Sequence, residues 1–128
     1  MSAGKLERVT LGRDSIVIRH YVAGLLGGKT LDTSGFAPDH IRAGHVVIRD
    51  TASGAYKPMP LDGDGAAYAA LPASHEYVGV VVATVPKDRP LVGVMYDGEV
   101  NDLAAPYSYE SIKDALRAAV PTLHFAHD

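Results

Sequence analysis

Residues 77–85 read YVGVVVATV and residues 91–96 read LVGVMY, so two runs of mainly apolar, β-branched residues lie close together in the chain. Runs of this length and composition are typical of strands that are buried on both faces. The segment between them, residues 86–90 (PKDRP), has the residues of a turn. We therefore expect these two runs to form the central strands of the domain.

The chain before this pair predicts one more strand and several turns. Residues 45–49 (HVVIR) have strand composition, and residues 50–54 supply a turn after them. Residues 55–57 continue outward until Pro58 and Pro60 end the pairing, because proline has no backbone N–H to donate. Residues 62–65 (DGDG) predict another turn.

The chain after this pair predicts one helix and a closing strand. Ser108 is a suitable N-cap, and an apolar stripe with helical spacing follows it. The stripe consists of Ile112, Ala115, Leu116, Ala119 and Val120. Pro121 ends the helix, and residues 123–126 have strand composition. Strands, then one helix, then a strand predict an α+β, mostly β domain.

The first third of the chain is harder to assign. Residues 1–14 are polar, whereas residues 15–23 are rich in β-branched residues and predict either a strand or an adhesive arm. Residues 24–44 contain five glycines, and we expect a long loop with at most one short strand. The expected organisation is an N-terminal arm and long loop over residues 1–40 and a β-rich core over residues 41–128.

Composition excludes several classes of function. The chain has 128 residues, which suits one domain, and it has no cysteine for a disulfide or a thiolate ligand. Twelve basic residues are scattered among fifteen acidic ones, so no basic stripe for nucleic acid is present. No apolar run reaches the length of a membrane span, and the first residues lack the apolar core of a secretory signal. We expect a soluble protein, synthesised in a cytoplasm, with no nucleic acid or membrane partner.

Two patterns suggest a ligand site, one for phosphate and one for a metal. Neither lies in the secondary structure that binding of that ligand requires. Residues 23–30 (AGLLGGKT) resemble a phosphate-binding loop, but the residues after Thr30 do not predict the helix that such a loop requires. His124 and His127 lie on a predicted strand, where a spacing of three places them on opposite faces. We therefore expect no nucleotide, no metal and no cofactor.

Catalytic groups are equally scattered. Ser74 and His75 are neighbours in the chain, and neighbouring side chains in an extended segment point apart. Asp97, Glu99 and Asp102 surround a predicted turn, where solvated carboxylates are the ordinary outcome. Tyr107 and Tyr109 more readily hold the start of the helix, or an interface, than bind a base. We expect no enzyme activity.

Four stretches, in this order, resemble the lambda-type head decoration proteins of tailed phages. They are IRAGHVV at residues 41–47, GAYKPM at 54–59, YVGVV at 77–81 with GVMYDGEVN at 93–101, and IKDALRAA at 112–119 with LHF at 123–125. The sequence GEVN ahead of the helix is the most specific of them. The family motifs fall on Gly44, Tyr56, Pro58, Gly79, Gly93, Gly98, Glu99, Val100 and Asn101.

The resemblance implies a β-clip-like domain that forms a homotrimer at local three-fold positions on the outside of an assembled capsid, where it stabilises the shell. The implied partners are the major capsid protein and two further copies of the chain. The family has an N-terminal arm that orders on the capsid, often by adding a strand to it. The matching residues here are Ile16, Val17, Ile18, His20 and Tyr21.

Two other functions remain open. A β-rich binding or fibre-base module of a phage tail or cell surface would share the strand pattern but present exposed loops to its partner. A small hydrolase that uses His and Asp would need converging titratable groups in a pocket, and the sequence does not place such groups together.

Overall fold

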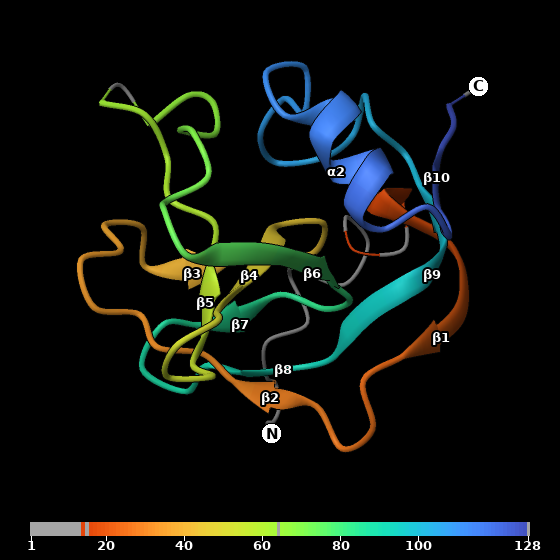
Figure 1. Cartoon of the computed structure of the whole chain (residues 1–128). Coiled ribbons are helices and arrows are strands. Elements are labelled where there is room, and N and C mark those ends of the chain that lie inside the picture. Colours follow the sequence, from red (N-terminus) through yellow and green to blue (C-terminus); the bar gives the residue numbers. More distant parts are fainter. Residues whose placement is uncertain (1–13, 15, 64, 128) are drawn as a thin grey trace.

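A computed structural model describes residues 14, 16–63 and 65–127 of the chain. A six-stranded sheet forms the centre of the molecule, with strand order β1-β9-β6-β4-β5 and with β10 also paired to β9 (Figure 1). The strands of this main sheet are β1 (Ile18–Gly24), β4 (Val46–Asp50), β5 (Tyr56–Pro58), β6 (His75–Val81), β9 (Val94–Val100) and β10 (Leu123–Phe125). All pairs are antiparallel except β10 with β9, which is parallel.

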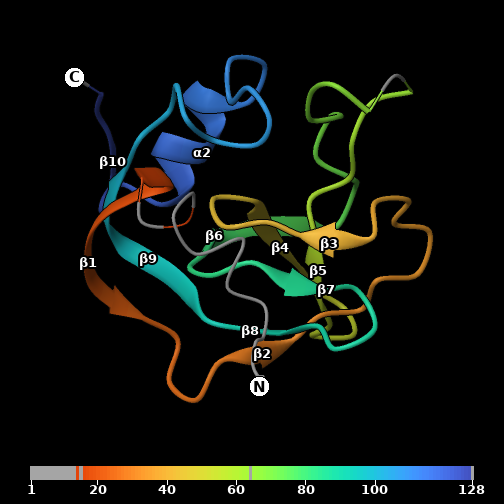
Figure 2. The ribbon, with the colours of Figure 1, turned by 180° about the vertical axis from the view of Figure 1, so that it is seen from behind.

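Two small sheets lie beside the main one. Strand β2 (Lys29–Thr30) pairs with β8 (Leu91–Val92), and β3 (His40–Ile41) pairs with β7 (Val85–Pro86). The helix α2 (Lys113–Ala119) lies on one side of the main sheet, and β2 with β8 lies on the other, as both views show (Figures 1 and 2). The structure therefore agrees with the expected α+β, mostly β class.

Both central runs form strands, but the strands do not begin and end where the sequence predicts. The run at residues 77–85 leaves the main sheet after Val81 and re-enters a small sheet as β7. The run at residues 91–96 is interrupted at Gly93, after which β9 continues to Val100. Residues 97–100 are therefore part of a strand and not of the expected turn. The breaks occur because the chain passes from one sheet to the other at these points.

A bulge in β6 determines which of its side chains face each side of the main sheet. Val47 pairs with Gly79 and Ile48 pairs with Tyr77, so Val78 is the extra residue on β6. The bulge reverses the alternation of side chains, and Tyr77 and Val80 consequently lie on the same face. Val81 packs on the other face, in a second cluster.

Two clusters of apolar side chains form the core. The helix-side core lies between the main sheet and α2, and its most deeply buried members are Val46, Ile48, Met59, Val80, Met95, Val100 and Leu116. The second core lies on the other face and consists of Leu31, Phe36, Ile41, Val47, Val81, Val92 and Val94. Residues 24–44 therefore supply core side chains and two short strands, whereas the sequence predicts a loop with at most one.

The division at residue 40 also needs correction. It falls inside β3, and residues 18–41 pair with strands β7, β8 and β9 of the later part of the chain. Residues 18–24 form a strand of the main sheet, so the described part of the expected arm belongs to the folded domain. Asp14, Ile16 and Val17 have helical conformation, and the strand begins only at Ile18. The expectation for residues 1–13 lies outside the described residues.

The helix forms where the apolar stripe predicts it, but it is shorter and differently capped. Ile112, Leu116 and Val120 are buried, whereas Ala115 and Ala119 are exposed, so the buried stripe is narrow. Ser108 accepts a hydrogen bond from the backbone N–H of Glu110 and does not cap α2. Pro121 follows the helix, and β10 then closes the sheet as expected.

Gly44 lies at a crowded turn just before β4. Its φ is +90°, and an added Cβ would lie 2.6 Å from Cγ1 of Val17 and 3.1 Å from the hydroxyl of Tyr109. That buried hydroxyl donates a 2.6 Å hydrogen bond to the Gly44 carbonyl. Backbone conformation and packing therefore both require glycine at this position.

We expect Gly44→Ala to lower the free energy of unfolding by more than about 2 kcal/mol, measured by chemical denaturation. Gly35→Ala is the matched control, since Gly35 has a φ of +77° with no atom within 4 Å of the added Cβ. Gly35→Ala should lower the free energy of unfolding by only about 1 kcal/mol, because alanine is strained in this left-handed conformation but meets no other atom. Equal losses in the two variants would contradict the packing described for Gly44.

Candidate functional site

The edge of the main sheet that β1 forms carries exposed apolar side chains. It includes residues that the sequence predicts to bind a partner. Strand β1 is the last strand in the order, and none of the described strands pairs with its outer edge. Ile16, Tyr21 and Val22 are 51%, 51% and 53% exposed. Apolar side chains of this size at a sheet edge are unusual, because such an edge can pair with another chain.

The five residues expected to bind the capsid do not form one surface. Ile16, His20 and Tyr21 are exposed, and Ile18 is partly buried against the helix-side core. Val17 is only 2% exposed, and its carbonyl accepts a hydrogen bond from the N–H of Asn101. Val17 therefore packs in the helix-side core of this structure and not on the exposed surface that the sequence suggests for it. Val22, which the sequence analysis did not select, is exposed beside Tyr21.

Strand β1 is held to β9 irregularly. The register between them shifts at three points, between Ile18 and His20 and on either side of Ala23. Arg19 donates a 2.9 Å hydrogen bond to the carboxylate of Glu99 on β9, and both side chains are partly exposed. Bulges of this kind increase the twist of an edge strand and limit where a further strand can pair.

The residues just before β1 are attached to the domain by Asp14. Its carboxylate accepts a 2.7 Å hydrogen bond from the Thr84 hydroxyl and a 2.9 Å bond from the Thr84 backbone N–H. The same hydroxyl accepts a hydrogen bond from the N–H of Ala43. Residues 14, 43 and 84 are thus connected at the bend where the chain leaves the main sheet.

We expect Asp14→Ala to destabilise the protein by about 1–3 kcal/mol, because the partly buried N–H of Thr84 loses its acceptor. Asp39→Ala at an exposed position is the control, and it should stay within about 0.5 kcal/mol of the parent. Thermal unfolding of the three proteins measures the difference. An unchanged transition for Asp14→Ala would mean that the segment before β1 is not attached to the domain.

Several family-motif residues contribute to strand packing or close a turn of the fold. An added Cβ at Gly79 would collide with the carbonyl of Met95 on β9, so this glycine permits the close approach of β6 and β9. Val100 is fully buried. The side-chain oxygen of Asn101 accepts 3.1 Å hydrogen bonds from the N–H groups of Leu103 and Ala104, which closes the turn after β9.

The other motif residues are dispersed over the main sheet and its neighbours. Pro58 is buried on β5, and the ammonium of Lys29 lies 5.2 Å from the ring centre of Tyr56. Gly93 separates β8 from β9, and Gly98 faces Tyr21 across the irregular β1–β9 ladder. The motif residues therefore do not converge on one surface.

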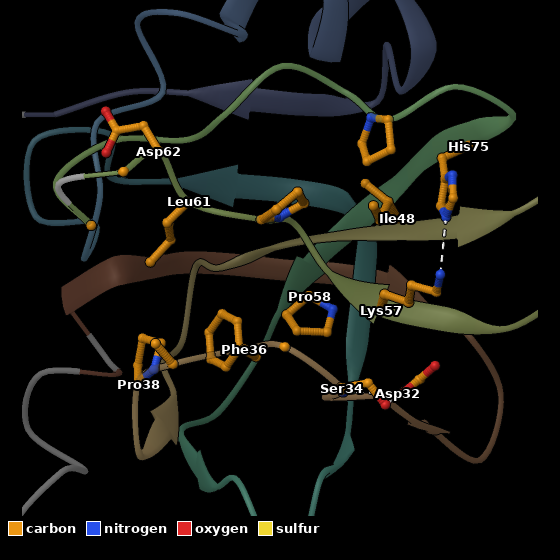
Figure 3. Close-up of a pocket in the computed structure, with 16 residues that line it drawn as sticks. Asp32, Ser34, Phe36, Pro38, Ile48, Lys57, Pro58, Leu61, Asp62 and His75 are labelled. Atoms are coloured by element: carbon orange, nitrogen blue, oxygen red, sulfur yellow. Dashed lines mark hydrogen bonds between the residues drawn. The ribbon is translucent and has the colours of Figure 1, made fainter.

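A groove about 590 Å³ in volume lies between the loop at residues 32–38, strand β5 and the segment at residues 60–72 (Figure 3). Its walls are mainly apolar and include Phe36, Pro58 and Leu61. At one end the ammonium of Lys57 donates a 3.3 Å hydrogen bond to Nε2 of His75. The carboxylate of Asp50 lies 4.0 Å from both groups, so this end has no net excess of positive charge.

Outside this groove, the carboxylate of Asp102 joins the start of α2 to the segment after β10. The hydrogen bond from Lys113 lowers the pKa of Asp102 to about 2, and His127 adds a second hydrogen bond to the same carboxylate. Over residues 14, 16–63 and 65–127, no group of three or more His, Asp or Glu residues could hold a metal ion. Lys29 and Thr30 form β2, so the glycine-rich segment is not followed by a helix.

The most exposed apolar side chain among the described residues lies outside every site that the sequence predicts. Leu26 is 97% exposed on a turn that the N–H of Gly28 closes onto the carbonyl of Leu25. Its signal in the sequence was the pair Leu25-Leu26 directly before two glycines, where only one leucine can pack inward. Leu25 does so, in the second core.

Comparisons of the chain with protein-family models, with curated proteins and with solved structures found no match. None of the helices in the described residues is both long enough and apolar enough to span a membrane.

Proposed function

We propose that this protein is a structural component of a phage virion that decorates and stabilises the capsid. In this proposal it binds the outside of the assembled shell as a homotrimer at local three-fold positions, and its partner is the major capsid protein. The finer description of the fold as β-clip-like is part of the same proposal.

The observation that carries the proposal is the exposed outer edge of β1. His20, Tyr21 and Val22 are exposed on this strand, and Ile16 is exposed in the segment just before it. Tyrosine is enriched in protein interfaces, because its ring gives a large contact area and its hydroxyl can still hydrogen-bond. An unpaired strand edge adds backbone N–H and C=O groups that a strand of the shell protein can pair with.

The motif resemblance supplies the identity of the partner. The stretches that carry it fall on β4, β5, β6, β9, α2 and β10, which together make up most of the main sheet and its helix. These elements form the scaffold, and β1 is added at its edge. In the proposal the scaffold is common to decoration proteins, and the edge makes the contact with the capsid.

A second candidate is the β-rich binding or fibre-base module, and the groove beside β5 favours it. The groove is built by loops, is lined by apolar side chains, and has a volume in the range of small-ligand sites. A receptor-binding module would use these loops, whereas capsid decoration would use the edge of β1. Variants at the two places therefore separate the two functions.

We expect Tyr21→Ala to weaken binding to expanded capsids by roughly 30-fold, since removing a central aromatic contact typically costs at least about 2 kcal/mol. Co-sedimentation with shells assembled from the major capsid protein of the same phage measures the affinity. Leu103→Ser is the matched control, because Leu103 is even more exposed but lies in the turn after β9. Thermal unfolding should be nearly unchanged in both variants.

Undiminished binding of Tyr21→Ala would remove β1 from the interface. Loss of capsid binding on Leu61→Ser, with Tyr21→Ala unaffected, would place the capsid contact in the groove and not on β1. A wild-type protein that does not bind the shells at all would favour the binding-module function. Light scattering on the protein released from shells should give the mass of a trimer. A dimer or a tetramer would contradict the proposal, because neither closes around a three-fold axis.

A further inference from the structure

A single histidine lies at the point where three separate segments meet. His45 directly precedes β4 and is fully buried. The rings of Phe36, Tyr68 and Tyr107 pack against it edge-on, with centroid distances of 5.2, 5.2 and 5.4 Å. These rings come from the loop before β3, the segment between β5 and β6, and the turn before α2, so the imidazole holds all three segments together.

The hydrogen bonding of the His45 ring shows which nitrogen carries the proton when the ring is neutral. Nε2 of His45 lies 2.9 Å from the carbonyl oxygen of Met59, so Nε2 carries the proton and donates it. Nδ1 is buried and has no hydrogen-bond partner among the described residues. The neutral ring therefore leaves one lone pair unsatisfied, and the charged ring would leave an N–H donor unsatisfied, which costs more.

We propose that His45 is an acid-sensitive switch whose protonation separates the three segments packed around it while the main sheet stays formed. This inference goes beyond the proposed function and does not depend on it. It rests on the burial of His45, on the unpartnered Nδ1 and on the absence of a counter-ion in the described surroundings.

The side chains facing the ring cannot neutralise an imidazolium. The titratable groups among its contacts are the phenols of Tyr68 and Tyr107, and no carboxylate is among the contacts that the structure gives for the ring. Burial raises the pKa of Tyr68 well above its ordinary value, so this phenol stays neutral. Its hydroxyl accepts a hydrogen bond from the N–H of Val46, and it is therefore not free to turn toward Nδ1.

Aromatic rings can also attract a cation, and this effect acts in the opposite direction. A cation–π contact contributes about 0.5–2 kcal/mol, whereas removing a charge from water without a partner costs several kcal/mol. Desolvation is the larger effect, and it lowers the pKa of His45 to about 4. The two effects predict opposite shifts of the pKa, and this makes the proposal easy to test.

The expected pH range follows from the two states. The unfolded ring titrates near pH 6.5 and the buried ring near pH 4. The open or unfolded state therefore binds more protons between these values, and stability is lost as the pH falls from about 6.5 to 4. The shift corresponds to a roughly 300-fold change in the equilibrium constant for opening in total. At pH 4 the change is roughly 150-fold, because the buried ring is then half protonated, and the rest follows at lower pH.

The first experiment is an NMR titration of the histidine Cε1–H signals in the wild-type protein. A His45 signal that titrates well below the values of the exposed histidines supports the proposal. A pKa above about 6.5 would overturn it, because the rings would then stabilise the charged imidazole. This measurement needs no variant and is unaffected by any folding defect.

The second experiment isolates the contribution of His45 from that of the carboxylates. Thermal unfolding is measured between pH 7 and pH 4 for the wild type, for His45→Phe, and for His40→Gln as a control at an exposed position of β3. Over this pH range His45→Phe should lose the roughly 150-fold change, and His40→Gln should retain it. The same pH dependence in all three proteins would exclude a role for His45.

Hydrogen exchange at pH 7 and pH 4.5 distinguishes local opening from global unfolding. Lower protection factors at pH 4.5 in the segments that carry Phe36, Tyr68 and Tyr107, with β6 and β9 still protected, support the switch. Protection factors are compared because the intrinsic exchange rate itself falls with pH. An equal loss of protection in the strands would show that acid unfolds the whole domain, and the proposed local switch would then be wrong. Because Phe36 and Leu61 line the groove, opening should also change its shape.

Discussion

Burial of both faces of the β4–β6 pair is the constraint on which the rest of the structure depends. An antiparallel sheet can leave one face in water, but the side chains of β4 and β6 are apolar on both sides. The helix α2 covers one face, and the short strands and loops of residues 29–41 cover the other. Each later element of the fold is placed by the need to cover one of these two faces.

Local patterns in the sequence predicted many of the strands and the helix that cover these two faces. How these elements are assembled depends on pairing between distant parts of the chain. The runs around residues 77–81 and 94–96, the stripe through Ile112 and Leu116, and the closing strand are read from neighbouring residues. The pairing of β1 with β9 joins residues some eighty positions apart, and no local pattern specifies it. For that reason the sequence of residues 15–23 is compatible with either a strand or an arm, and it does not show that Val17 belongs to the core.

The candidate site could be predicted only in part, again because contacts between distant segments determine the rest. Composition identified residues 16–21 as β-rich and adhesive, but exposure is set by tertiary packing, which separates Val17 from Tyr21. The bulge at Val78 and the surroundings of His45 depend on contacts between distant segments, so neither could be inferred from spacing. Leu26 and the groove are products of loop geometry, which composition alone does not determine.

The pairing of β1, β2 and β3 with β9, β8 and β7 has a consequence for how the chain is made. On a ribosome, residues 18–41 emerge early, but their partner strands at residues 85–100 emerge only after most of the chain has been synthesised. The first third of the protein must therefore remain without its partners until translation is nearly finished. An interrupted translation product would expose an unpaired strand with Tyr21 and Val22, which is a segment prone to aggregate.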